Sequence, residues 1–191
     1  MLQYSSMAQR CDNGSNEGDE WVFGYGSLIF KVDFPYLERS AASVEGWERR
    51  FWQGSHDHRG TPEAPGRVLT LIARAGIACA GMAYRVRQRT LLALDYREKN
   101  GYQRQRIDML LATGQRVHGL TYVAPPGNPA FLGPASDEVI ARQMLASRGP
   151  SGSNADYVIE LAAALQALGE DDAHVFGLAA LVKQIQEMGK Q

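Results

Sequence analysis

The stretch VFGYGSL (residues 22–28) brings an apolar, strand-like run onto two glycines that flank a tyrosine. Gly24 and Gly26 carry no Cβ atom, so ligand atoms can approach the main chain closely at the end of this strand. Consecutive N–H groups in such a turn form a concavity that holds an anion, and Ser27 adds a hydroxyl. The glycine spacing differs from that of phosphate-binding and dinucleotide-binding loops. Two interpretations stay open: a loop that binds a small acid, and a barrel corner or β-bulge that needs glycine for geometry alone.

The composition is that of an ordinary globular protein. Of the 191 residues, 45% are hydrophobic, and the formal net charge is −1. Neither nucleic acid nor a membrane is expected as a partner, because there is no basic surplus and no apolar run of about 18 residues. The 2 cysteines indicate a reduced, cytoplasmic setting rather than a disulfide framework. Residues 1–19 are polar and are expected to form a disordered leader, followed by a single domain over residues 20–188.

Strand signals dominate the chain after the leader. Apolar and β-branched runs predict strands at residues 21–25, 68–73, 79–86, 104–111 and 116–123. Residues 74–76 are predicted to form a short turn between the second and third strands, and Thr113-Gly114 the turn of another hairpin. Because these segments are short and locally paired, the sheet is expected to be mostly antiparallel, either open or closed into a small barrel.

One predicted helix interrupts the strands and three follow them, so the predicted fold class is α+β. Thr90 can cap the first helix, which ends at Asn100-Gly101. The boundaries predicted for the others are a start at Ser136 and a stop at Gly149-Pro150, a cap at Asn154, and a start at Asp171 or Asp172. Apolar stripes on the last two helices comprise Val158, Leu161, Leu165 and Leu168, and Val175, Leu178, Val182 and Ile185.

Glu98 stands out on the first helix because it shares a face with two leucines. Leu91, Leu94 and Glu98 are spaced at i, i+3 and i+7, which puts the carboxyl at an inward position. The last helical turn also disfavours an anion, so burial and the helix dipole both raise the pKa of Glu98. Such a carboxyl suits general acid–base catalysis. The alternatives are a solvated carboxylate or a structural ion pair with Arg97, Arg104 or Arg106.

The segment that follows residue 55 offers weaker candidates. His56 and His58 have the same-face spacing of a strand, which suggests a metal, but no third ligand is identifiable and no metal is expected. Arg59 and Arg67 can clamp a substrate carboxylate, although a surface or loop-stapling role is favoured for either residue taken singly. No Ser-His-Asp or Cys-His set is legible in the sequence.

Six stretches, in order between residues 20 and 185, are similar to one known family. They are WVFGYGSLIFKVDFPY (21–36), RRFWQGSHDHRGTPEAPGRVLTL (49–71), GMAYRV (81–86), DYREKNGY (95–102), NPAFLGPA (128–135) and SRGPSGSNADYV (147–158). These stretches resemble the ChaC family of glutathione-specific γ-glutamylcyclotransferases. The block over residues 49–71 is the most specific, because GYGSL alone is shared by several cyclotransferase-like proteins.

The resemblance implies a small β-barrel flanked by helices that cleaves glutathione to 5-oxoproline and cysteinylglycine without a metal or cofactor. Glu98 matches the catalytic glutamate of the family. The substrate loop, which binds the γ-glutamyl part, matches Val22, Phe23, Gly24, Tyr25, Gly26, Ser27 and Leu28. Departures from the family pattern are Phe30 for Trp, His56 for Thr and Asn100 for Gly. Two alternatives stay open: a cyclotransferase that acts on other γ-glutamyl amines or dipeptides, and a non-catalytic module that binds a small acid or a partner.

Overall fold

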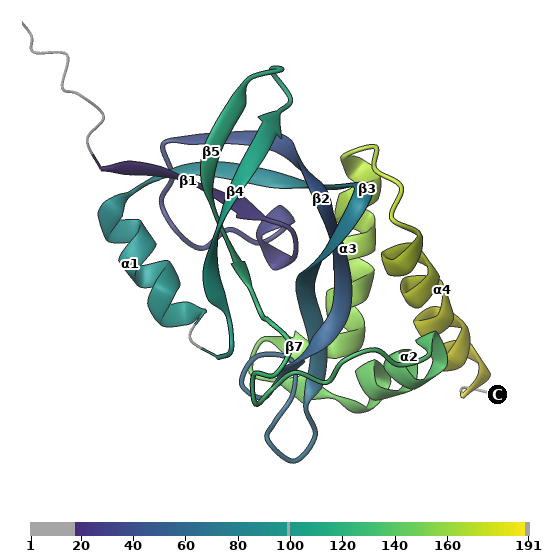
Figure 1. The fold of residues 1–191 in the computed structure, drawn as a ribbon. Helices are drawn as coiled ribbons and strands as arrows, with labels where there is room; N and C mark the ends of the chain where they lie inside the picture. The colour runs from purple at the N-terminus through teal and green to yellow at the C-terminus, as the bar shows by residue number, and fades with distance from the viewer. Residues whose placement is uncertain (1–17, 99, 190–191) are drawn as a thin grey trace, which may run out of the picture.

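Five strands form a closed barrel in the order β1-β3-β2-β4-β5 (Figure 1). They are β1 (Asp19–Gly24), β2 (Glu38–Ser55), β3 (Gly66–Arg87), β4 (Gln103–Leu111) and β5 (Arg116–Val123). The computed structural model describes residues 18–98 and 100–189. Of the disordered leader expected over residues 1–19, positions 1–17 therefore lie outside the described residues. Neighbouring strands are antiparallel except β1 and β5, which meet in parallel at Val22 and Leu120. The predicted small, mostly antiparallel barrel flanked by helices is therefore confirmed.

Strands β2 and β3 form the long hairpin of the barrel. The prediction of two strands joined by a turn at residues 74–76 is wrong, because β3 is continuous from Gly66 to Arg87. Ala78 pairs with Glu45 and Ala73 pairs with Trp47, so the four residues 74–77 lie opposite Gly46 alone. Gly46 and Gly76 have φ values of 81° and 78°, which glycine adopts readily. The local signal that predicted a turn therefore belongs to a bulge.

The second hairpin and the helix before it follow the prediction more closely. Strands β4 and β5 pair in register from Gln103 with Val123 to Leu110 with Arg116, as predicted. Helix α1 (Gln88–Arg97) follows β3 directly, and its N-cap is Arg87, so the prediction that Thr90 caps it is wrong. The apolar face of α1 covers the barrel, because Leu91 and Leu94 are buried.

Three further helices are α2 (Asp137–Ala146), α3 (Asn154–Ala167) and α4 (Ala173–Met188); α2 and α3 contact β3 of the long hairpin, and α4 packs on α2 and α3 (Figure 1). Ser136 caps α2 and Asp172 caps α4 through their side-chain oxygens, as predicted. The predicted cap Asn154 lies inside α3, whose cap is Ser153, because the Asn154 side chain bonds the main chain of β3 instead. Helix α2 ends at Ala146, and the short strands β6 (Arg148–Gly149) and β7 (Gly152–Ser153) separate it from α3.

The helices bury the apolar stripes that the sequence predicted. The fully buried positions of these stripes are Val158, Leu161, Leu165, Val175, Leu178 and Val182. They form one core cluster with the barrel interior, which includes Phe23, Phe51 and Leu71. None of the helices in the described part of the chain is sufficiently long and apolar to span a membrane.

Candidate active site

Strand β1 ends in the glycine loop (residues 22–28), which turns into the 3-10 helix η1 (Ser27–Ile29). A Cβ atom at position 24 would lie 2.5 Å from the Cβ of Leu28, and one at position 26 would lie 2.8 Å from the Tyr157 hydroxyl. The loop therefore needs glycine at both positions for close packing. At Gly26 the neighbouring group is a hydroxyl from α3, so the bare backbone lies beside a polar group.

Residues 23–28 of the glycine loop line an inner compartment of about 70 Å³ together with aromatic and ionisable side chains, whereas Val22 is buried and does not line it. Its other lining residues are Leu69, Arg97, Glu98, Tyr102, Tyr122 and Tyr157. Tyr25 donates a hydrogen bond of 2.7 Å to the Tyr122 carbonyl, and Tyr102 donates one of 2.6 Å to the Leu69 carbonyl. The Tyr122 hydroxyl donates to Asp95 at 2.8 Å. Three of the four tyrosine protons are thus engaged by acceptors within the protein.

The tyrosine hydroxyls of the inner compartment stay protonated at neutral pH. Burial is the largest cause that raises the pKa of Tyr25 and of Tyr102 well above the usual value. Burial also raises the pKa of Tyr157 to about 12, against the opposing effect of Arg59. These groups are therefore suited to donate hydrogen bonds and unsuited to act as bases.

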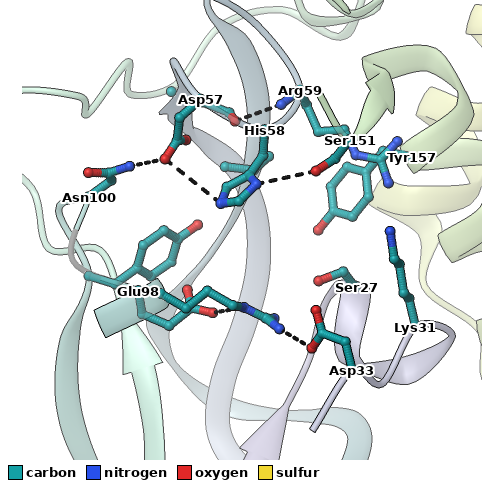
Figure 2. A pocket seen from close by; sticks show the side chains of 15 residues that line it. Ser27, Lys31, Asp33, Asp57, His58, Arg59, Glu98, Asn100, Ser151 and Tyr157 are labelled. Atoms are coloured by element: carbon teal, nitrogen blue, oxygen red, sulfur yellow. Dashed lines mark hydrogen bonds and ion pairs between the residues drawn. The ribbon is translucent and has the colours of Figure 1, made fainter. Parts of the chain in front are cut away.

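A larger outer compartment of about 180 Å³ adjoins the inner one (Figure 2). The residues that line both compartments are Ser27, Arg97, Glu98, Tyr102 and Tyr157. The outer one is more polar, since Lys31, Asp33, Asp57, His58, Arg59, Asn100 and Ser151 contribute to its wall. A ligand that fills both compartments must pass the Glu98 carboxyl.

Glu98 is the C-cap of α1, and its side chain is 21% exposed. Its backbone N–H donates to the Leu94 carbonyl, and the buried leucines of α1 fix the direction of the helix. Burial raises the pKa of Glu98, and the neighbouring Arg97, whose Nε lies 3.1 Å from Oε1, opposes this rise. The carboxyl therefore takes up and releases a proton more readily near neutrality than an exposed glutamate does.

The ion-pair alternative for Glu98 holds for Arg97 alone. Arg97 bridges Glu98 and Asp33 across the pocket wall (Figure 2). Arg104 pairs instead with Asp95, and Arg106 pairs with Glu20 at 2.7 Å. An ion pair and a raised pKa thus coexist at Glu98, because burial outweighs the attraction of Arg97.

A Ser-His-Asp set that was not legible in the sequence lies on the outer wall. His58 Nδ1 is 3.2 Å from Ser151 Oγ, and His58 Nε2 is 3.8 Å from Asp57 Oδ2 (Figure 2). The second distance is too long for a hydrogen bond. The His58 and Asp57 side chains are 54% and 43% exposed, so the set lacks the buried, orienting carboxylate of a hydrolytic triad. We therefore assign no nucleophile to it.

The two arginines considered as a clamp are not brought together. Arg67 donates to the carbonyls of Phe51 and Gly133 at 3.0 and 2.9 Å, so the loop-stapling alternative holds for Arg67 and the clamp does not. Arg59 lines the outer compartment, donates to the Ser153 carbonyl and lies over the Tyr157 ring at 5.1 Å.

The two histidines considered as metal ligands also separate. His58 faces the outer compartment, whereas His56 lines a neighbouring groove beside residues 125–130. Residues 18–98 and 100–189 contain no group of three or more His, Cys, Asp or Glu side chains that could hold a metal ion.

Sequence reasoning missed several residues of the pocket wall, above all Lys31, Tyr102, Ser151 and Tyr157. All four lie in the stretches WVFGYGSLIFKVDFPY, DYREKNGY and SRGPSGSNADYV, so the family resemblance carried a signal for them. Nothing in the local pattern indicates that α3 brings Tyr157 onto Gly26.

Comparisons with known proteins agree with the resemblance seen in the sequence. The profile of the ChaC-like protein family matches residues 20–185. The γ-glutamylcyclotransferase 2-3 of Arabidopsis thaliana is 44% identical, with 86% of this chain and 89% of the relative covered. The glutathione-specific γ-glutamylcyclotransferase 1 of Homo sapiens is 41% identical, with 91% and 82% covered. A crystal structure of a yeast γ-glutamyl cyclotransferase specific to glutathione is similar with a TM-score of 0.81 at 30% identity, covering 87% of this chain and 96% of that one.

Proposed function

The chain belongs to the ChaC family, and on this premise we propose that it cleaves glutathione to 5-oxoproline and cysteinylglycine. The observation that carries the proposal is the Glu98 carboxyl in the wall between the two compartments. Glutathione has a matching division, since the γ-glutamyl amide bond separates a small arm from a dipeptide. We infer that the γ-glutamyl arm occupies the inner compartment and that cysteinylglycine occupies the outer one. The domain proposed to carry out the reaction spans residues 20–188.

The reaction needs no nucleophile from the protein. The α-amino group of the substrate attacks its own γ-carbonyl carbon and closes a five-membered ring, and the bond to the cysteine nitrogen then breaks. Holding the two ends in this geometry can contribute up to about 7–11 kcal/mol in ideal cases. The small inner compartment favours the folded γ-glutamyl chain over an extended one.

Glu98 moves the proton in this scheme. It accepts a proton from the attacking amine and delivers it to the departing cysteine nitrogen, so the carboxylate is regenerated in each turnover. The raised pKa suits both steps, because the group must be a base first and an acid afterwards. Main-chain N–H groups of residues 22–28 are proposed to bind the α-carboxylate.

Tyr157 is the best candidate to stabilise the oxyanion. Its hydroxyl is protonated and donates to no acceptor within residues 18–98 and 100–189, which leaves its proton for the substrate. The hydroxyls of Tyr25, Tyr102 and Tyr122 already donate to acceptors within the protein. Removal of a single oxyanion donor typically lowers kcat by about 10²–10³-fold.

The proposal is tested by incubating the purified protein with glutathione and identifying the products by mass. Glu98→Gln keeps the shape of the side chain but cannot relay a proton, so we expect a loss of about 10²-fold or more in kcat. If this variant releases 5-oxoproline as fast as the wild type, the role assigned to Glu98 is wrong. Binding of glutathione by a wild type that releases no 5-oxoproline would favour the non-catalytic module.

Substrate preference is tested with γ-glutamyl-alanine and γ-glutamyl-lysine beside glutathione. Equal or faster turnover of these compounds would favour the broader cyclotransferase.

The low cysteine content, with Cys79 buried as a free thiol, supports the cytoplasmic location that forms part of the proposal.

A further inference from the structure

Most cations around the outer compartment are engaged by groups of the protein. Arg97 pairs with Asp33 and with Glu98. Arg59 is buried, donates to the Ser153 carbonyl at 3.0 Å and lies over the Tyr157 ring. These contacts fix both guanidinium groups in the pocket wall and leave them little freedom to follow a ligand.

Lys31 differs from these arginines. It lies two residues after Ile29, the last residue of η1, and its backbone N–H donates to the Ser27 carbonyl at 2.7 Å, so the glycine loop fixes its position. Its side chain is exposed, and its ammonium forms no ion pair or hydrogen bond with residues 18–98 or 100–189. Figure 2 shows the ammonium in the pocket on the side opposite Glu98, beside Tyr157 and Ser27.

The proposed substrate carries an anion that this part of the pocket must accommodate. Glutathione has one carboxylate on the γ-glutamyl arm and a second on the glycine. The glycine carboxylate lies two residues beyond the bond that breaks, which is about 7 Å of extended chain at most. Asp33, Asp57 and Glu98 also line the outer compartment, so an anion placed there needs a cation nearby.

We propose that Lys31 binds the glycine carboxylate of glutathione and thereby sets the preference for glutathione over γ-glutamyl compounds that lack this group. The inference rests on the proposed function and extends it to the recognition of the cysteinylglycine half. An ammonium on a flexible stem can reach a carboxylate and form a charge-assisted hydrogen bond with it. The place of Lys31 next to the glycine loop lets one short segment contact both carboxylates of the substrate.

The test compares two substrates and four proteins. Lys31→Met removes the charge and keeps an unbranched stem, while Lys183→Met does the same on the exposed face of α4 as a control. The substrates are glutathione and its glycine amide, which lacks the terminal negative charge. For glutathione, we expect Lys31→Met to lower kcat/KM by about tenfold, mainly through KM. For the amide, the wild type and Lys31→Met should be alike, and Lys31→Arg should restore most of the activity on glutathione.

Binding in the Glu98→Gln background separates this inference from the proposed function. Calorimetric titration measures Kd for glutathione and for the amide without turnover. A weaker Kd for glutathione, but not for the amide, when Lys31→Met is added supports the inference whatever the rate of cleavage. Equal effects on both compounds, or none on glutathione, overturn it. Absence of 5-oxoproline from the wild type would instead overturn the proposed function.

Discussion

The Arg49 guanidinium donates a hydrogen bond of 2.8 Å to the main-chain carbonyl of Tyr25, in the middle of the glycine loop. Arg49 lies on β2 with 2% of its side chain exposed, and its Nε is 2.9 Å from a carboxylate oxygen of Asp172, the N-cap of α4. A second hydrogen bond reaches the Ala80 carbonyl on β3. One buried cation therefore links the loop to a strand and a helix that lie far apart in the sequence.

Arg49→Lys is expected to weaken both folding and catalysis. An ammonium keeps the charge but cannot reproduce the fork that contacts three acceptors, and a buried acceptor left unsatisfied typically costs about 1–3 kcal/mol. We expect the free energy of unfolding to fall and KM for glutathione to rise several-fold, because the loop N–H groups lose their support. Urea denaturation and steady-state kinetics measure the two effects.

Arg50→Lys is the matched control for this prediction. Arg50 is the next residue on β2, but its ion pair with Glu48 lies away from the glycine loop, and its side chain is 23% exposed. A change within about 0.5 kcal/mol and an unaltered KM are expected. If Arg49→Lys lowers stability while KM stays at the wild-type value, Arg49 supports the fold alone and does not position the loop.

Gly26→Ala tests the close approach between the loop and α3. The new Cβ would lie 2.8 Å from the Tyr157 hydroxyl, so the hydroxyl must move or the loop must shift. Overpacking of this kind typically costs about 1–3 kcal/mol, and we expect kcat/KM to fall by about 10²-fold as the proposed oxyanion donor is displaced. Thermal unfolding and product formation provide the measurements.

A double mutant and a control make this prediction specific. Adding Tyr157→Phe removes the atom that clashes, so Gly26→Ala should destabilise the Tyr157→Phe background less than the wild type. Gly177→Ala on α4 introduces a methyl into open space and should raise stability by up to about 1 kcal/mol without affecting activity. Additive destabilisation in the double mutant would show that the loop and Tyr157 are not in contact.

Local features of the fold could be predicted from the sequence because their signals lie within a few residues. Strands β4 and β5 pair around a turn at Gly114, whose φ of 83° suits glycine. Side-chain caps and apolar stripes identified α2, α3 and α4. Strand β2 has no counterpart among the predicted strands, since charged residues such as Glu48, Arg49 and Arg50 interrupt its apolar pattern. Arg49 is buried because its partners come from three distant segments.

In the candidate site, too, the local features could be predicted from the sequence and the long-range ones could not. The spacing of Leu91, Leu94 and Glu98 fixes the face of α1 that carries the carboxyl, so periodicity sufficed to single out Glu98. The pocket, by contrast, arises where β1, α1 and α3 meet, and no local pattern in the sequence encodes that meeting. No local pattern therefore identifies Tyr157 and Lys31 as pocket residues, and only the family resemblance carried a signal for them.

Glu98→Gln is expected to stabilise the protein in a pH-dependent manner. Below the ordinary pKa of 4.5, the carboxyl is protonated in both the folded and the unfolded state and imposes no penalty. As the pH rises from 4.5 through the raised pKa of the native state, the unfolded chain loses its proton first, so the free energy of unfolding of the wild type falls. Glutamine lacks this titration, so the variant should be the more stable protein at pH 7 and about equal at pH 4.

Urea denaturation at the two pH values measures this difference, and Glu138→Gln, on the exposed first turn of α2, serves as the control. A variant that is less stable than the wild type at pH 7 would mean that the Arg97 ion pair outweighs the burial of Glu98. Greater stability combined with lost turnover would instead indicate that the Glu98 carboxyl destabilises the fold but is required for catalysis.

Arg97→Met is expected to shift the acid limb of the kcat/KM profile to higher pH. Arg97 lowers the pKa of Glu98, whereas Asp33 raises it, and Arg97 forms an ion pair with Asp33. Removal of the guanidinium therefore raises the pKa of Glu98 in two ways, because the cation is lost and the Asp33 carboxylate is left without its partner. If Glu98 must be ionised to accept the proton of the substrate amine, activity then begins at a higher pH. Arg106→Met, at a side chain 73% exposed and paired with Glu20, should leave the limb in place. An acid limb that stays fixed or moves to lower pH in Arg97→Met would assign that limb to a group other than Glu98.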